Sequence, residues 1–595
     1  MKKRLALILA LVFYVSILPP LSSAAVIKGN FSDIITKGPW VDVRAYGAAL
    51  TDVPIQAAFD AHPTGNATIY IPAGNYTIGT ELLWNGVDNI TIRGDGIGRT
   101  ILDASALADI PKRSGLGYNR TWGVLSINPM NMDTGLDDYH YNVTLENMTI
   151  IGSASAPVSP VYQKLVVWST TNNVTFRNVE FVGAYYEQVY GAVSTGKTMK
   201  DQTVENCIFR NNVTGGMFNI NTGAVVDSVR IINNVFDNGA IGINALHRGA
   251  KIRGNHFINM HGQVVMLGDG TTTTTKIFDG YDVTGNYFKG LGTGASSGAT
   301  VYGINLTSGS VIPTDNSMAG GNIVSSNSFI DSVSPAGGGQ VIGINVFGNA
   351  LVSNNIFSGI STAGSGTADT AIRINYANAS DTFQRVMLSG NVVEDTPTSK
   401  AGGKGWNFGI SATGNDNAVY HLSGNKVGGI NTGWYAFYMG AFPSQPIVTF
   451  NGDIFNGQIG TNTALNSMNL NDSSFNNMPI YGDLVHGLRT SISDDIRPAG
   501  YSQFTDNATT PSVAGGKIWY TNNTGATSIT NFTGGVNGQI ITLFFIDANT
   551  TIVHGATIGL DNSANFVATP DDTLTLGYLW KSGGLKWYEL SRSVN

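Results

Sequence analysis

The sequence has almost no cysteine and little charge, and both shortages limit what the protein can be. Its 595 residues include a single cysteine, Cys207, so no disulfide within the chain can stabilise the fold. Charged residues make up 12%, about half of the roughly 25% that is usual in globular proteins, and the net charge is −7. No basic cluster is available to neutralise phosphates, which argues against a nucleic-acid partner. Stability must therefore come from packing and from backbone hydrogen bonds.

Hydrophobic residues, in contrast, are plentiful. They account for 42% of the chain, and the sequence also contains 74 glycines. A disordered chain would combine low hydrophobicity with a high net charge, which this sequence does not do. Ample hydrophobic residues among many glycines, asparagines and threonines are typical of short strands joined by tight turns. The composition predicts an all-β protein.

The first 25 residues have the pattern of a secretion signal. Three basic residues at 2–4 precede an apolar run at 5–18, and small residues end the segment at Ala25. The run is shorter than the roughly 20 residues that cross a bilayer, and no later segment is long and apolar enough to do so. We expect residues 1–25 to be removed and the mature chain, without a membrane span, to be secreted or displayed at the cell surface. Export argues against a virion protein, which assembles inside its host.

A short phrase made of Asn (once Asp), any residue and then Phe or Val recurs through the middle of the chain. The copies start at Asn234, Asn255, Asn286, Asn327, Asn355, Asn391, Asn425 and Asp453. Successive copies lie 21 to 41 residues apart. A repeat of variable length is typical of a solenoid, because insertions enter loops while the strands stay in register. Stacked coils would place each Asn at a bend, where it can hydrogen-bond the Asn of the next coil.

A second phrase recurs between these copies. Ile-Gly-Ile-Asn at 241–244 is echoed at 302–305, 342–345, 372–375 and 408–411. Since neighbouring residues of a strand point to opposite faces, we expect the isoleucines to face the interior and the glycine and asparagine positions to face outward. The outward glycines, Gly242, Gly303, Gly343 and Gly409, would form a strip close to the backbone. The asparagines beside it, Asn244, Asn305, Asn345 and Asn375, are candidate substrate-binding residues.

These repeats predict a parallel β-solenoid over residues 26–483, and four N-terminal motifs carry a more specific resemblance. They are Val-Asp-Val-Arg-Ala-Tyr-Gly-Ala at 41–48, Gln-Ala-Ala-Phe at 56–59, Ile-Pro-Ala-Gly-Asn-Tyr at 71–76 and Arg-Gly-Asp-Gly at 93–96. The set resembles the pectate-lyase-like superfamily, in its branch of rhamnogalacturonan-degrading enzymes and phage tailspikes. The resemblance implies a right-handed parallel β-helix, a short N-terminal capping helix at 56–59 and a long carbohydrate as the target. The chain departs from the family between Gly47 and Gln56, where a Gly-Asp-Gly loop with paired aspartates is usual.

The repeats stop near residue 484, and the pattern changes. Residues 484–516 read as a linker, and residues 517–595 contain longer alternating strands typical of a compact all-β module. The ending at 587–593 is similar to the C-terminal modules of phage tail-fibre-like and secreted β-helix proteins. That resemblance implies a homotrimer formed through this module. A monomeric cap over the open end of the solenoid is the alternative, and the sequence leaves both open.

Two catalytic mechanisms fit a polysaccharide substrate on this scaffold. A lyase needs a base that removes the proton beside a uronic acid carboxylate, and a cation or Ca²⁺ that neutralises this carboxylate. His247 or Tyr190 is the candidate base, and Arg248 or Arg373 is the candidate charge clamp. No dense cluster of aspartates marks a metal site, so no metal ligand is assigned, although Ca²⁺ stays open as a cofactor.

A hydrolase instead needs two carboxyl groups about 5–9 Å apart. Glu187 and Asp269 are the candidates, but two coils separate their strands, which would place them more than about 9 Å apart. Tyr185 and Tyr186 could stack on sugar rings, although one of two adjacent strand residues is expected in the core. The remaining alternative is a non-catalytic, adhesin-like β-helix that binds glycans. The scarcity of charge favours that alternative, and the family resemblance favours an enzyme.

Overall fold

A computed structural model describes most of the chain between residues 40 and 594. The described residues are 40–86, 88–114, 116, 120–129, 139–157, 164–193, 197–220, 225–245, 247–267, 280–306, 321–360, 369–375, 384–394, 407–412, 418–427, 435–439, 447–451, 453–455, 458–461, 480–481, 484–486, 502–514, 518–581 and 584–594. The predicted signal segment lies outside them. Within the described part, no helix is long and apolar enough to cross a membrane.

The chain divides into two compact units. One comprises residues 1–457 and 477–487, and the other comprises residues 458–476 and 488–595. The first contains the repeats and the second contains the C-terminal module. The exact boundaries predicted from the sequence, at 483 and 516, remain predictions.

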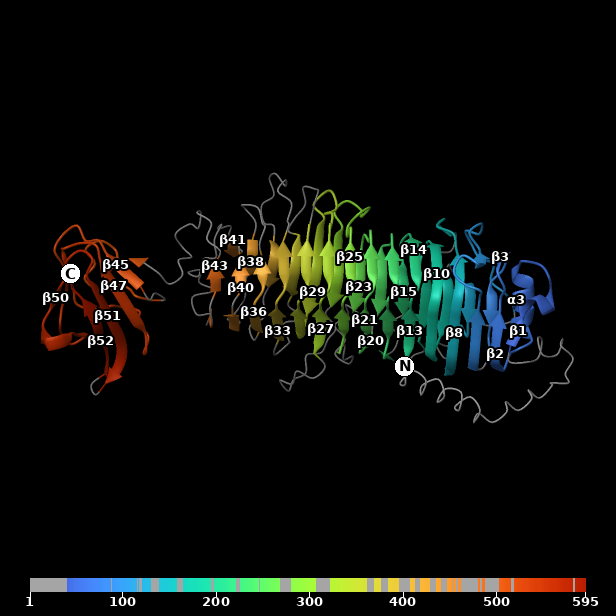
Figure 1. Cartoon of the computed structure of the whole chain (residues 1–595), viewed down its shortest axis with the longest axis horizontal. Coiled ribbons are helices and arrows are strands. Elements are labelled where there is room, and N and C mark those ends of the chain that lie inside the picture. Colours follow the sequence, from blue (N-terminus) through green and yellow to red (C-terminus); the bar gives the residue numbers. More distant parts are fainter. Residues whose placement is uncertain are drawn as a thin grey trace, which may run out of the picture. The chain divides into compact units, whose positions relative to one another are not determined.

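The first unit is a parallel β-helix, as predicted. Its strands form two long sheets and one short sheet, and every pairing in them is parallel, with each strand bonded to the corresponding strands of the coils before and after it (Figure 1). Parallel strands joined by crossovers within one sheet are right-handed in almost all proteins. The predicted fold class is therefore confirmed.

The strand bounds follow for each sheet. In sheet A, the first row of strands is β1 (Trp40–Asp42), β2 (Gly65–Tyr70), β5 (Asp88–Arg93), β8 (His140–Ile151), β10 (Thr171–Ala184), β13 (Gln202–Glu205), β17 (Arg230–Ile232), β21 (Lys251–Arg253), β24 (Asp282–Thr284), β27 (Asn322–Ser325), β30 (Ala350–Ser353), β33 (Gln384–Ser389), β36 (Ala418–Ser423), β39 (Ile447–Asn451) and β42 (Ile480–Tyr481). The second row shares β8 and β10 and adds β3 (Gly74–Thr77), β6 (Thr100–Asp103), β14 (Ile208–Asn212), β18 (Val235–Asp237), β22 (His256–Ile258), β25 (Tyr287–Lys289), β28 (Ser328–Ile330), β31 (Ile356–Ser358), β34 (Val392–Glu394), β37 (Lys426–Val427), β40 (Asp453–Phe455) and β43 (Leu484–His486).

Sheet B contains β4 (Leu82–Trp84), β7 (Gly123–Ile127), β9 (Lys164–Ser169), β11 (Val189–Ala192), β15 (Gly216–Ile220), β19 (Ile241–Ala245), β23 (Gln263–Leu267), β26 (Thr300–Leu306), β29 (Gln340–Phe347), β32 (Thr370–Asn375), β35 (Asn407–Ala412) and β38 (Tyr435–Met439). Sheet C is short and contains β12 (Thr198–Lys200), β16 (Val225–Asp227) and β20 (His247–Arg248).

The interior of the β-helix holds a stack of phenylalanines from the first repeated phrase. Consecutive rings from Phe209 to Phe357 lie 4.5 to 4.9 Å apart, with interplanar angles of 4 to 13°. All of them are essentially inaccessible to solvent. The ring spacing equals the spacing between strands, so each coil adds one ring to the same apolar column.

Beside the phenylalanines runs a buried ladder of asparagine side chains. Each Asn Oδ1 accepts hydrogen bonds from the backbone N–H and from the Nδ2 of the Asn one coil earlier, as Asn286 does for Asn255 at 2.9 and 3.0 Å. Each Nδ2 also donates to a backbone carbonyl, which for Asn286 is that of Ile252. The ladder begins where Asn234 accepts from the N–H of Cys207 and ends at Asp453. The predicted stacking of the Asn repeat is thus confirmed.

Cys207 occupies the first position of this ladder as a free, buried thiol. Burial raises its pKa to about 12, so the thiol is uncharged and unreactive at neutral pH.

The predicted outward glycine strip is wrong. A Cβ added to Gly303 would lie 2.6 Å from Cε1 of Phe329, and one added to Gly343 would lie 2.5 Å from Cε1 of Phe357. The glycines therefore face the phenylalanine stack, which leaves no room for a side chain. The following isoleucine, Ile304, is also fully buried. Each phrase thus has two consecutive inward residues, and Tyr302 and Asn305 on either side of the pair face outward.

A short helix closes the N-terminal end of the β-helix, as the family resemblance implied. Helix α3 (Asp52–Asp60) begins after Thr51, whose side chain accepts the N–H of Val53. The side chain of Gln56 then bonds the backbone of the edge strand β4, as a neighbouring strand would. Its Oε1 accepts the N–H of Leu83 and its Nε2 donates to the carbonyl of Leu83, both at 2.8 Å. A single side chain therefore satisfies both backbone groups of Leu83 at the edge of the sheet.

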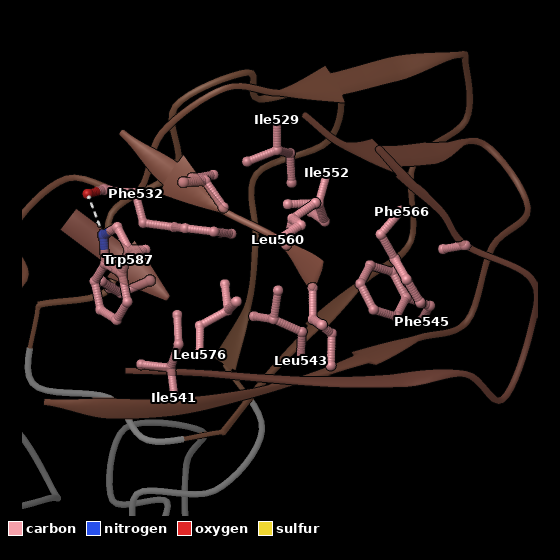
Figure 2. Packing of buried hydrophobic residues seen from close by; sticks show 14 of the residues in the cluster. Ile529, Phe532, Ile541, Leu543, Phe545, Ile552, Leu560, Phe566, Leu576 and Trp587 are labelled. Atoms are coloured by element: carbon pink, nitrogen blue, oxygen red, sulfur yellow. Dashed lines mark hydrogen bonds between the residues drawn. The ribbon is translucent and has the colours of Figure 1, made fainter. Parts of the chain in front are cut away.

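The C-terminal unit is an all-β module with its own core. Its larger sheet contains β44 (Ser502–Gln503), β45 (Ile518–Thr521), β47 (Ile540–Phe545), β51 (Thr573–Lys581), β52 (Gly584–Ser593) and β49 (Ile558–Gly559), and its smaller sheet contains β46 (Thr527–Ile529), β48 (Thr550–Ile552) and β50 (Phe566–Val567). Figure 2 shows the core between them, where Trp587 packs against Phe532 and donates its indole N–H to the Phe532 carbonyl. Phe504 and Val513 also belong to this core, so it extends into the segment predicted to be a linker.

The asparagine ladder leads to a first prediction. Replacing Asn286 with alanine leaves the buried N–H and side chain of Asn255 and the carbonyl of Ile252 without partners. Because each buried unsatisfied group costs about 1–3 kcal/mol, we expect the variant to lose about 3 kcal/mol or more in the free energy of unfolding. Guanidinium denaturation followed by circular dichroism measures this loss. In the matched control Asn238→Ala, an exposed bond to Asn211 is removed at a left-handed position, and a loss of only about 1 kcal/mol is expected. Equal losses in the two variants would contradict a special role of the buried ladder.

The inward glycines lead to a second prediction. In Gly303→Ala the new methyl group collides with the Phe329 ring and with the carbonyl of Gly343, so the backbone must shift. Overpacking of this kind costs about 1–3 kcal/mol, and the melting temperature should fall accordingly. Gly79→Ala is the control, because the nearest atom to its added Cβ is 3.7 Å away. An unchanged melting temperature in Gly303→Ala would mean that the glycines face outward after all.

Candidate functional site

A continuous row of side chains runs along the outer face of sheet B. The strand register places one residue of each coil beside the next, in the order Tyr190, Asn219, Asn244, Met266, Asn305, Asn345 and Arg373. Three of the four predicted substrate-binding asparagines therefore share one line. The fourth, Asn375, lies two residues beyond Arg373 and donates to Asn345 at 2.6 Å.

The C-terminal half of this row is one hydrogen-bond network. Asn305 donates to Oε1 of Gln263 at 3.0 Å, and Asn345 donates to Oδ1 of Asn305 at 2.7 Å. Arg373 then donates from Nε to Oδ1 of Asn345 at 3.0 Å. Its Nη2 donates to the hydroxyl of Tyr302, also at 3.0 Å. These bonds fix the orientation of each polar group on the outer face.

The N-terminal end of the row holds a compact polar cluster, which we call the Lys164 cluster: Lys164, Glu187, Tyr190 and Asn219. Lys164 and Glu187 form an ion pair of 2.9 Å, with side-chain exposures of only 6% and 18%. The Lys164 ammonium also lies 4.7 Å from the centre of the Tyr190 ring. Asn219 donates to the same carboxylate at 3.3 Å. The cluster brings a carboxylate, a cation and a phenol together at the surface of sheet B.

Two of the predicted catalytic residues, Glu187 and Tyr190, thus lie together. Sequence reasoning missed Lys164 and Asn219, their partners. The only available signal for Lys164 was a charged residue at the start of the apolar run at 165–168. Nothing in the sequence distinguished Asn219 from the many other asparagines.

Tyr185 and Tyr186 lie next to this cluster, in the bend between β10 and β11. Their rings are 4.9 Å apart in an edge-to-face arrangement, and both are half-buried. The expectation that one of them belongs to the core is wrong, because the strand ends at Ala184 and alternation does not continue through the bend. Both rings are available at the edge of the outer face.

The other catalytic candidates lie elsewhere. His247 and Arg248 belong to sheet C, where they pair in register with the buried Val226 and with Asp227. Asp269 lies outside the described residues. Arg373 is six strand spacings from Tyr190 along the row, or about 29 Å at about 4.8 Å each. Tyr190 and Arg373 therefore do not meet in one centre, and the catalytic role of each candidate remains a prediction.

Comparison with known proteins finds a family match for the first part of the β-helix. Residues 40–276 match the model of a family described as rhamnogalacturonase A/epimerase, pectate lyase-like. Over this segment the β-helix is similar to that pectate-lyase-like family. The matched segment includes the capping helix, the Lys164 cluster and Asn244, and the matched family is named for carbohydrate-active enzymes. No curated protein sequence matches the chain significantly.

Several solved structures resemble the pectate-lyase-like β-helix at low identity. The surface adhesin PfbA of Streptococcus pneumoniae is 15% identical over 71% of this chain and 90% of its own, with a TM-score of 0.38. The catalytic unit of an α-1,3-glucanase from Streptomyces thermodiastaticus is 14% identical over 67% and 65% of the two chains, with a TM-score of 0.36. The A-module of a mannuronan C-5 epimerase from Azotobacter vinelandii is 15% identical over 75% and 96%, with a TM-score of 0.34.

Calcium does not fit the described part of the pectate-lyase-like β-helix. Among the described residues, no three His, Cys, Asp or Glu side chains gather where a metal ion could bind. Ca²⁺ prefers six to eight oxygen ligands, mostly carboxylates and carbonyls. The one carboxylate of the Lys164 cluster is already paired with a lysine, so we derive no step through a metal.

His261 lies in the bend before β23 of the pectate-lyase-like β-helix, and it leads to a third prediction. Burial lowers the pKa of its imidazole below the ordinary value, and its Nδ1 has no hydrogen-bond partner among the described residues. The folded state thus binds this proton less readily than the unfolded state, so stability is lost as pH falls below the ordinary histidine pKa. Between about pH 7 and about pH 5, the wild type should lose more stability than His261→Gln. Denaturation at both pH values measures this difference, and an NMR titration that gives an ordinary or raised pKa would contradict it.

Proposed function

We propose that the protein is secreted and holds an extended polysaccharide along the outer face of sheet B. The single observation that carries this proposal is the row from Tyr190 to Arg373, in which seven successive coils each place one residue on the outer side of sheet B, with Asn305 and Asn345 buried within it. A polymer of similar sugars needs similar contacts at regular intervals, and stacked coils repeat their contacts at every strand spacing. The partly buried amide of Asn219 suits this role, because an amide can donate to or accept from a sugar hydroxyl, while the buried Asn305 and Asn345 hold their neighbours in place.

The Lys164 cluster is the place at which we propose chemistry. Glu187 is the one carboxylate in it, so the described residues do not supply the pair that hydrolysis needs. The combination of Tyr190 and Lys164 instead suits elimination. Deprotonated Tyr190 removes the proton beside the sugar carboxylate, a carbon–carbon double bond forms as the glycosidic C–O bond breaks, and the Tyr190 hydroxyl returns the proton to the leaving oxygen. Lys164 is the cation of the cluster that would stabilise the sugar carboxylate. Tyr185 and Tyr186 would contact the sugar rings beside the reacting bond.

A second candidate is glycan binding without catalysis. The observation that favours it is the distance between Tyr190 and Arg373, which keeps the predicted base away from the predicted clamp. In this case the whole row binds a polysaccharide and keeps the protein attached to it. The resemblance of residues 587–593 implies a trimeric C-terminal module. A trimer would carry three copies of the row and so multiply its contacts with a polysaccharide.

Activity of the mature protein on uronate-rich and neutral polysaccharides tests the proposal. Elimination should produce both new reducing ends and the ultraviolet absorbance of an unsaturated uronate. We expect Tyr190→Phe to lower kcat by about 100-fold or more with little change in KM, because general base catalysis is typically worth at least that much. Tyr287→Phe is the matched control, since Tyr287 lies on β25 of sheet A.

Each result has a defined meaning. Reducing ends without absorbance would indicate hydrolysis and exclude Tyr190 as the base of an elimination. Binding without either signal would establish the second candidate. Folded protein that neither binds nor cleaves any polysaccharide in a broad panel would show that the proposal is wrong.

A further inference from the structure

Arg373 stands out on the outer face of sheet B as a fixed cation whose partners among the described residues are all neutral. Its Nε and Nη2 donate to Asn345 and Tyr302, and its guanidinium carbon lies 5.5 Å from the centre of the Tyr302 ring. Among the described residues no acidic side chain pairs with it, and its Nη1 donates to none of them. The side chain is half-buried, so its charge is only partly hydrated.

Most other arginines of the described chain are matched to carboxylates. These pairs are Arg44 with Asp42, Arg93 with Glu146, Arg113 with Asp52, Arg120 with Glu81, Arg177 with Glu205, Arg210 with Glu180, Arg253 with Asp282 and Arg592 with Glu589. In a chain with so few charges, pairing is the rule for an arginine. Arg373 also occupies the position of the outer row, the row from Tyr190 to Arg373, at which the two preceding coils have the amides of Asn305 and Asn345.

We infer that Arg373 recognises an oxyanion, a carboxylate or a sulfate group, carried by the polysaccharide that the outer row binds. The inference rests on the proposed function and adds the chemical class of the substrate. A guanidinium presents its N–H groups in a planar fork that matches the oxygens of either anion. Two of its nitrogens are already held by neutral groups, so the remaining N–H groups stay aimed away from the network.

Tyr302 and Asn345 are the positioning residues of this site. The Tyr302 ring and hydroxyl restrain one side of the guanidinium, and the Asn345 carbonyl restrains Nε. Asn345 is itself fixed, because its Oδ1 also accepts from Asn375 and its Nδ2 donates to Asn305. Preorganisation reduces the entropy that binding must overcome, so these neutral contacts favour an anion without neutralising the arginine.

The site also lies away from the proposed chemistry. About 29 Å separates Arg373 from Tyr190, so an acidic group bound at Arg373 belongs to a sugar well removed from the reacting one. Loss of the arginine should therefore weaken binding and leave the chemical step intact. In kinetic language, KM should rise while kcat stays nearly constant.

The first experiment probes the anion site without any polysaccharide. Titration of the full mature protein with inorganic sulfate, and separately with free galacturonate, is followed by calorimetry at low ionic strength. We expect wild type to bind at least one of the two anions and Arg373→Met to bind it about tenfold or more weakly, as expected for a charge-assisted bidentate pair. Arg230→Met is the matched control, because Arg230 lies exposed on β17 of sheet A and its loss removes the same charge. Equal binding by wild type and Arg373→Met, or equal loss in the two variants, overturns the inference.

The second experiment uses polygalacturonate, a sulfated dextran and neutral dextran. Comparison of polygalacturonate with sulfated dextran shows whether the recognised oxyanion is a carboxylate or a sulfate. The inference expects wild type to bind an acidic polymer more tightly than the neutral one, with a preference that falls as salt rises and disappears in Arg373→Met. Equal affinity for acidic and neutral polymers overturns the inference and leaves the proposed function standing. Anion binding at Arg373 without binding of any polymer supports the anion site and overturns the proposed function.

The positioning role has its own readout. Tyr302→Phe keeps the ring beneath the guanidinium and removes only the acceptor hydroxyl. We expect it to weaken anion binding severalfold while the melting temperature without anion stays unchanged. A variant that loses stability and keeps its anion affinity would show that Tyr302 is merely structural.

Discussion

The hydrogen bonds between parallel strands set one distance, the spacing of neighbouring coils, and the rest of the β-helix depends on it. At about 4.8 Å this spacing suits stacked aromatic rings and amide-to-amide hydrogen bonds alike. The phenylalanines stack 4.5 to 4.9 Å apart for this reason. The asparagine ladder follows the same spacing, and each of its amides bonds a backbone N–H and another amide. A chain with a single cysteine can be held together in this way because every coil repeats the same satisfied contacts.

The same spacing explains how much of the fold the sequence could reveal. Residues that stack must be alike, so Asn-x-Phe and Ile-Gly-Ile-Asn recur, and the recurrence identifies coils even where loops differ in length. The direction of Gly303 could not be derived from alternation. Two consecutive inward residues, Gly303 and Ile304, break the period of two, and only the position of the Phe329 ring, on β28 of sheet A, reveals it. A glycine marks a close approach, but its sequence position does not say from which side.

The candidate site, too, could be predicted from the sequence only in part. The row of Asn244, Asn305 and Asn345 was predictable, because it depends only on register. The contact between Lys164 and Glu187 was not, because 22 intervening residues and a full coil separate them, and the length of a coil varies. The distance between Tyr190 and Arg373 depends on the number of coils between them. Counting phrases gives that number only where every coil carries a recognisable phrase, and β11, β15 and β23 do not carry the Ile-Gly-Ile-Asn phrase.

The distribution of charge separates the two long faces of the β-helix. On sheet A, arginines and acids of neighbouring coils pair with each other, as Arg93 does with Glu146 and Arg210 with Glu180. In each of these ion pairs the two charges neutralise each other and leave no net charge for a ligand. On sheet B the row consists mainly of neutral groups, with an internally paired lysine at one end and Arg373 at the other. In the described part of this face Arg373 has no acidic partner, which adds little electrostatic attraction for most macromolecules yet distinguishes an acidic polymer from a neutral one at that point. Selectivity on this face therefore depends on whether an acidic group of the polymer reaches Arg373 at this end of the row.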